Sequence, residues 1–440
     1  GDQSVSKPDQ SVTPMMAQFL EIKEDYPSAL LFYRMGDFYE LFFDDAVAAA
    51  QALDITLTKR GKHQGADIPM CGVPVHAAEG YLLNLIRKGF RVAVCEQLEN
   101  PQEAKKRGAK SVVKRGVVRL VTPGTLTEDT LLHPRESNFL AAFVQVRDQS
   151  CLAWVDISTG DIRYSPCPPV RLGPELARLT PAEVLIAEGA ADDVLEIIYE
   201  AGAAATQLPP EAFDSTAGAE TICRAYGVGD LGGLGDFGRA DIAAVSGLIE
   251  YLSTTQKGQL PLLRRPVCEA RDDFVAIDAA TRKNLELTQT LSGDRSGSLL
   301  SVVDRSVTAA GARLLSRRIT TPSQRLATID ERASAVEFFC GQSGLRGAVR
   351  AALKQLPDVE RALGRVALER SGPRDLLALA SGIAQAEQVH ALLAQHDLPP
   401  LLQNAAEDLK GFEALSDELD RALVAEPPLL TRDGGFVASG

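Results

Sequence analysis

The stretch GDFYELFFDDA, residues 36–46, marks the point where an apolar run gives way to helical spacing, and it decides the first part of the fold. Residues 30–33 before it, Leu-Leu-Phe-Tyr, have the length that a buried strand needs. A glycine then allows a sharp turn, and Asp37 is a favourable helix N-cap. The spacing therefore predicts a helix that begins after Asp37, with Phe38 at its first position and Glu40 at its third.

A purely structural interpretation of this stretch is open as well. Asp37 and Glu40 have the three-residue spacing of a capping box, in which two side chains only satisfy free backbone N–H groups at a helix start. Phe38 would then be an ordinary packing residue. Local spacing alone favours this interpretation, so a functional one needs support from the rest of the chain.

Composition indicates a globular protein of two to four domains. The chain has 440 residues, of which 45% are hydrophobic and 24% charged, and no uninterrupted apolar run is long enough to span a membrane. Residues 1–12 are polar and lack the apolar core of a signal peptide, so we expect a cytoplasmic protein without membrane association. Seven cysteines without a CxxC pair, and only five histidines, indicate reduced thiols and no metal centre.

The net charge of −13 argues against a generic nucleic-acid binder, but this charge is unevenly distributed. Residues 1–127 hold 16 Lys and Arg against 15 Asp and Glu, so the acidic excess belongs to the rest of the chain. Residues 105–119 contain seven basic side chains and no carboxylate. This stretch predicts either a phosphate-facing patch or a solvated basic loop, and the sequence alone does not choose between them.

The order of apolar segments predicts three regions. Strands and helices are mixed up to about residue 127. An antiparallel meander and a parallel strand–helix–strand unit follow, with expected elements at residues 139–146, 152–157, 162–164, 184–186, 191–199 and 204–207. From Ala279 onward the strand patterns disappear, and Leu- and Ala-rich helical spacing dominates.

Five strings occur in the same order as in the MutS family, which the chain resembles over nearly its whole length. They are FYRMGDFYELF (32–42), LTKRG (57–61), VRLVTPGT (118–125), DAATRKNLEL (278–287) and RDGGFVASG (432–440). The resemblance implies a multidomain fold, α/β plus all-α: a mixed α/β mismatch-recognition domain (1–127), a ribonuclease-H-like connector domain (128–278) and a helical core/lever domain (279–440). It also implies that the last of these is truncated before the clamp.

The resemblance implies recognition of mismatched or unpaired bases in double-stranded DNA, which initiates mismatch repair. In this family the Phe of a Phe-Tyr-Glu motif wedges into DNA beside the mispaired base and kinks it, so Phe38 is the expected wedge. Glu40 is the expected partner of the displaced base, and Tyr39 is expected to pack inward. The full set of expected DNA-binding residues is Phe38, Glu40, Met35, Lys59, Arg60, Lys114 and Arg115.

Partners and cofactors follow from the same resemblance. It implies mismatched DNA and a MutL-type partner that docks on the connector domain. It implies a homodimer for the intact protein, leaves a monomer open for this fragment, and places the protein in the cytoplasm at the nucleoid. Intact family members carry a C-terminal ATPase domain that uses ATP and Mg. No GxxxxGK[ST] motif occurs here, so we expect neither a cofactor nor enzymatic activity in this fragment.

Two other functions can be weighed against the sequence. Gly227, Gly229 and Gly232 satisfy the GxGxxG dinucleotide pattern, but they follow an expected helix rather than a strand, which is the wrong context for such a site. A two-metal nuclease would need several converging carboxylates. Asp156 and Asp161 instead bracket the turn STGD, where aspartate is favoured for turn chemistry.

Overall fold

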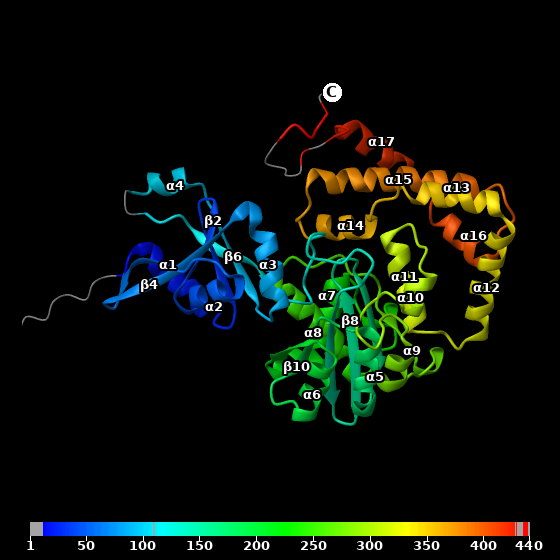
Figure 1. The fold of residues 1–440 in the computed structure, drawn as a ribbon, viewed down its shortest axis with the longest axis horizontal. Helices are drawn as coiled ribbons and strands as arrows, with labels where there is room; N and C mark the ends of the chain where they lie inside the picture. The colour runs from blue at the N-terminus through cyan, green and yellow to red at the C-terminus, as the bar shows by residue number, and fades with distance from the viewer. Residues whose placement is uncertain (1–11, 109–110, 427, 429–433, 439–440) are drawn as a thin grey trace, which may run out of the picture. The chain divides into compact units, whose positions relative to one another are not determined.

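The computed structural model describes residues 12–108, 111–426, 428 and 434–438. The polar N-terminus, Lys110 and both ends of the 432–440 string therefore lie outside the described residues. The chain divides into two units, residues 1–126 with 252–259 and residues 127–251 with 260–440, and each unit is considered by itself (Figure 1).

The first unit is built on a six-stranded sheet with the order β3-β4-β2-β1-β5-β6, in which only the β1–β5 pairing is parallel. Its strands are β1 (Leu30–Met35), β2 (Phe38–Phe42), β3 (Thr58–His63), β4 (Ala66–Pro74), β5 (Val92–Gln97) and β6 (Arg115–Val121). Its helices are α1 (Pro14–Glu24), α2 (Phe43–Leu53), α3 (Ala78–Arg87) and α4 (Pro101–Lys106), with a short 3₁₀ turn at Val75–Ala77.

Aromatic packing fixes α1 against this sheet. The Phe19 ring meets the Tyr33 ring edge-on at 5.5 Å and the Phe42 ring at 5.0 Å, and all three side chains are buried. The Thr13 hydroxyl accepts a hydrogen bond from the Met16 N–H, and Pro14 occupies the first helical position. Thr13 is therefore the N-cap of α1.

The predicted helix after Asp37 is wrong. Residues 38–42 form strand β2, which pairs antiparallel with β1 through a two-residue turn, and the helix begins only at Phe43. Gly36 makes this turn with a φ of +61°. Strand β2 also pairs along its length with β4, from Phe38 opposite Pro74 to Phe42 opposite Met70. This pairing with a distant segment satisfies the backbone of β2, so the capping-box spacing of the motif is incidental.

The second unit begins with another mixed sheet, in the order β11-β10-β7-β8-β9-β12. Strands β7, β8 and β9 form the predicted antiparallel meander, and β10 and β11 add in parallel beside β7. The strands are β7 (Phe139–Val146), β8 (Gln149–Asp156), β9 (Asp161–Pro166), β10 (Glu183–Ala187), β11 (Ala204–Leu208) and β12 (Val267–Cys268). The helices here are α5 (Pro169–Leu179), α6 (Asp192–Glu200), α7 (Ser215–Tyr226) and α8 (Arg239–Thr255), whose last residues belong to the first unit.

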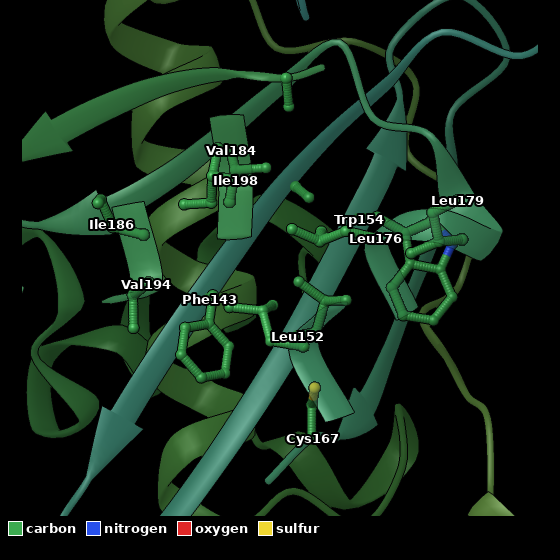
Figure 2. Packing of buried hydrophobic residues seen from close by; sticks show 13 residues of the cluster. Phe143, Leu152, Trp154, Cys167, Leu176, Leu179, Val184, Ile186, Val194 and Ile198 are labelled. Atoms are coloured by element: carbon green, nitrogen blue, oxygen red, sulfur yellow. The ribbon is translucent and has the colours of Figure 1, made fainter. Parts of the chain in front are cut away.

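Helices α5 and α6 cover one face of this sheet. Leu172, Leu176 and Leu179 of α5 and Val194 and Ile198 of α6 pack with inward-facing residues of β7, β8 and β10. Figure 2 shows the labelled members of this core, with the Trp154 ring beside the leucines of α5. The meander followed by two parallel strands agrees with the expected α/β fold of this region.

The rest of the second unit is helical, as predicted from Ala279 onward. The helices are α9 (Ala279–Leu285), α10 (Leu299–Val303), α11 (Ala309–Thr320), α12 (Leu326–Gly341), α13 (Ser343–Leu353), α14 (Val359–Ala367), α15 (Pro373–Leu393), α16 (Pro400–Glu407) and α17 (Glu413–Ala422). Figure 1 shows α13 and α15 side by side, and Val349, Val389 and Leu393 share one buried cluster. By length and composition alone, α15 could cross a membrane, but a single such helix is weak evidence for a membrane span.

Helix α14 is joined to the turn after β8. The buried Arg361 side chain donates hydrogen bonds to the Ser158 hydroxyl at 3.2 Å and to the carbonyl oxygens of His133 and Glu136 at 3.0 and 2.8 Å. A Cβ added at Gly364 would lie 2.5 Å from the Ser158 carbonyl oxygen, so only glycine allows this approach.

Candidate nucleic-acid interface

The β1–β2 hairpin presents Phe38 at its tip. Met35 and Phe38 are the last residues to pair before the two-residue turn, and the Phe38 side chain is 47% exposed. Its neighbours along the strand, Tyr39 and Leu41, are buried. A large apolar side chain is therefore held away from the core on a paired backbone, where a binding partner can reach it.

Tyr39 packs inward, as predicted, and connects the hairpin to β5. Its ring lies 5.6 Å from the Phe32 ring, and its hydroxyl donates a hydrogen bond to the Glu96 carboxylate on β5. Arg34 donates to the other oxygen of Glu96 at 3.3 Å. Burial and the neighbouring Glu96 carboxylate raise the pKa of Tyr39, so this hydroxyl remains a donor at all physiological pH values.

Glu40 and Arg60 form an ion pair at the edge of the hairpin. Arg60 donates from Nη1 to the Glu40 Oε2 at 2.7 Å, bringing together two residues that the sequence places twenty positions apart. Burial raises the pKa of Glu40, and the Arg60 charge offsets only part of this rise. Glu40 is thus a partly buried carboxylate whose charged form is favoured by Arg60 and, to a smaller extent, by Arg115.

Lys59 lies beside Arg60 on β3 but points to a different partner. Its ammonium group forms an exposed ion pair with Asp67 at 2.8 Å, which raises the pKa of Lys59. Exposed pairs of this kind are weak, so phosphate could displace Asp67 at little cost. The structure therefore leaves Lys59 accessible on β3, which β4 separates from the hairpin.

The basic stretch 105–119 does not form one uniform surface. Lys105 and Lys106 are on α4, whereas Arg107 pairs with Glu99 and holds the pKa of that carboxyl at about 2. Lys114 is exposed, and its backbone N–H donates to Glu99 at 2.7 Å. Arg119 is buried, and Arg115 points toward the hairpin rather than into solvent.

Arg115 and Met35 are in contact. The Arg115 guanidinium donates from Nη2 to the Met35 sulfur at 3.4 Å and from Nε to the Arg34 carbonyl oxygen at 2.7 Å. Met35, Phe38, Glu40, Arg60 and Arg115 therefore gather at one end of the sheet. Lys59 and Lys114 instead contact Asp67 and Glu99, which lie outside the hairpin. The supporting residues Arg34 and Glu96 were missed from the sequence, because an isolated pair of opposite charges 62 residues apart carries no recognisable spacing.

The features weighed for other functions have structural roles. Gly227 ends α7 in the left-handed conformation, with a φ of +64°. Asp156 is buried and accepts hydrogen bonds from Ser158 and from the Asn138 N–H, whereas Asp161 pairs with Arg317 at 2.7 Å. Within the described ranges no group of three or more His, Cys, Asp or Glu side chains could hold a metal ion.

Comparison with known proteins extends these observations to the whole chain. Family models match in order: MutS domain I over residues 13–130, MutS domain II over 138–264 and MutS domain III over 280–439. The fold and the exposed hairpin thus define a protein built from these three MutS domains.

Curated relatives agree with this assignment. The DNA mismatch repair protein MutS of Dinoroseobacter shibae is 62% identical over 430 residues, covering 98% of this chain and 49% of the relative. That of Roseobacter denitrificans is 60% identical with the same coverage, and that of Paracoccus denitrificans is 61% identical over 428 residues, covering 97% of this chain and 48% of the relative. The chain belongs to the MutS family, and it spans about half the length of these relatives.

Proposed function

We propose that this chain recognises mismatched or unpaired bases in double-stranded DNA, with Phe38 as a wedge that enters the stack and kinks the duplex. The observation that carries the proposal is the half-exposed Phe38 ring at the tip of a hairpin, on a strand whose following apolar residues Tyr39, Leu41 and Phe42 are buried. A wedge of this kind must unstack a base step at a cost of a few kcal/mol. A mispaired base has already lost part of that stacking and pairing, so it yields at lower cost.

The surroundings of Phe38 suit this task. Strand β2 is paired on both sides, by β1 and β4, so the ring is carried on a backbone that resists bending back. Arg60 and Lys59 on β3 and Lys114 before β6 supply positive charge for the phosphates near the wedge. The discrimination in this proposal rests on deformability, because a single apolar ring reads no base sequence.

Glu40 has a separate role in the proposal. A carboxylate brought among phosphates is repelled, and protonation removes that repulsion. Burial already raises the pKa of Glu40, which favours the protonated form. We assign to Glu40 a hydrogen bond with the displaced base, made in exchange for its pairing with Arg60, and a penalty against paired DNA that offers no such partner.

The remaining assignments concern the longer protein. We propose that the full-length protein adds an ATPase domain that uses ATP and Mg, forms a homodimer around DNA, binds a MutL-type partner through its connector domain and works in the cytoplasm at the nucleoid. The present chain contains no GxxxxGK[ST] motif, so ATP hydrolysis and cofactor binding are assigned outside it. The supporting observations are the three consecutive MutS domains and the half-length coverage of the relatives.

A titration of this chain with two duplexes that differ only in one G·T mismatch tests the proposal. The measurement is made at low and at moderate salt, because binding through phosphates alone weakens with salt equally for both duplexes. We expect tighter binding to the mismatched duplex at both salt concentrations. Equal affinities, or no binding to either duplex, would contradict mismatch recognition by this chain.

A further inference from the structure

The backbone pairing of strand β1 with its neighbour β5 stops two residues before the end of β1 nearest the Phe38 turn. The β1–β5 pairing ends with Tyr33 opposite Cys95, so Arg34 and Met35 have no backbone partner on that side. On the other side they pair only with β2, which carries the wedge. The backbone alone therefore supports the hairpin tip from one side, through β2 and β4.

Arg115 reaches this unsupported end from two strands away. It begins β6 opposite Gln97 of β5, and its guanidinium spans to the Arg34 carbonyl oxygen at 2.7 Å and the Met35 sulfur at 3.4 Å. A third contact runs from Nη1 to Oε1 of the Gln18 side chain on α1 at 3.2 Å. One planar cation thus joins α1, β1 and β6 at the turn end of the hairpin.

The same guanidinium lies over the Tyr33 ring. Its central carbon is 4.9 Å from the ring centroid, and Nη1 also donates to the Val113 carbonyl oxygen at 3.1 Å. The donors of Arg115 are therefore directed toward acceptors within the domain. A side chain that neutralises phosphate would instead direct its donors toward solvent, as the exposed Lys59 and Lys114 can.

We propose that Arg115 is a positioning residue that fixes the turn end of the β1–β2 hairpin, and so aligns and stiffens Phe38, rather than a phosphate contact. This inference rests on the proposed wedge function. When the ring bends the DNA, the bent DNA pushes back on the strands that carry the ring. A hairpin that gives way under this force would lose discrimination before it loses non-specific affinity.

Lysine could not take over this role, because its single ammonium group cannot reproduce a fork that meets several acceptors in one plane. It could, however, replace arginine at a phosphate, where only the charge is needed. Arg115→Lys therefore separates the two roles. The positioning role predicts that the mismatched-to-matched affinity ratio falls about tenfold, equivalent to the loss of one charge-assisted hydrogen bond, while the salt dependence of binding stays native.

The test compares Arg115→Lys with Lys59→Gln and Phe38→Ala in the same titrations, with amide hydrogen exchange of the DNA-free chain as a second measurement. For Arg115→Lys we expect faster exchange confined to residues 35–41 at an unchanged melting temperature. Lys59→Gln, as the control for a phosphate contact, should weaken binding to both duplexes and lower the salt slope by about one. A native affinity ratio and native exchange in Arg115→Lys would overturn the inference.

Two further comparisons separate a failure of the wedge function from a failure of the positioning role. If Phe38→Ala keeps the native affinity ratio, the wedge function itself fails; if only Arg115→Lys keeps it, the positioning role alone fails. Should Arg115→Lys not fold, Gln18→Ala removes one acceptor of the guanidinium and leaves Arg115 in place. It should lower the affinity ratio in the same direction by a smaller factor, and an unchanged ratio would contradict the inference.

Discussion

Replacing Phe38 with alanine should leave the domain folded but remove its preference for mismatched DNA. The ring is 47% exposed, so its loss should cost less than about 1 kcal/mol of unfolding free energy. Phe42 in the same strand is 1% exposed, and Phe42→Ala should cost about 3–5 kcal/mol. Insertion into DNA would bury the exposed part of the Phe38 ring, about 95 Å² of a side chain of about 200 Å². At about 25 cal/mol per Å² this is ~2.4 kcal/mol, or roughly 50-fold in affinity for a mismatched duplex.

Fluorescence anisotropy with mismatched and matched duplexes measures this loss, and chemical denaturation measures stability. Val47 on α2 offers a control, because it is 44% exposed and lies outside the hairpin. Val47→Ala should leave both affinities native. The reasoning would be refuted if Phe38→Ala bound mismatched DNA as tightly as the native chain, or if it unfolded as readily as Phe42→Ala, since Phe38 would then be a core residue.

Three further predictions follow from other contacts. Arg60→Gln should raise the pKa of Glu40 above its native value, because the guanidinium charge and its hydrogen bond hold that pKa down; an NMR titration with an unchanged pKa would show that the ion pair is absent in solution. Glu40→Ala should tighten binding to matched DNA and shrink the mismatch preference, and an unchanged affinity ratio in competition titrations would rule out its role in discrimination. Gly364→Ala should destabilise by ~1–3 kcal/mol through the Ser158 carbonyl oxygen, whereas Gly347→Ala on α13 has open space and should stabilise slightly; equal melting temperatures for these two variants would contradict the packing of α14.

The hairpin shows what local sequence patterns can predict and what they cannot. The local pattern correctly predicted a strand at residues 30–33 and an inward-packed Tyr39. It assigned Phe38 and Glu40 to a helix, because Asp37 and the later alanines satisfy helical spacing. The competing information is the pairing of β2 with β4, whose partner residues run from Phe38 with Pro74 to Phe42 with Met70, a separation that no local window contains.

Side-chain partners were harder to predict than elements. The meander β7–β8–β9 could be read from its two short polar turns, because such turns join antiparallel strands. The charge of Arg115 was equally visible in the sequence, but its direction depends on where β1 stops pairing with β5. The ion pair of Glu40 with Arg60 likewise depends on the order of strands in the sheet.

Fluorescence of 2-aminopurine placed beside a G·T mismatch tests the central claim most directly, because this base brightens when it is unstacked. Under saturating conditions, the native chain should raise the fluorescence, since the Phe38 ring replaces the stacking neighbour. Phe38→Ala should bind at a higher concentration without this rise. An equal rise with Phe38→Ala at saturation would contradict the account, because unstacking would then not depend on the ring at the hairpin tip.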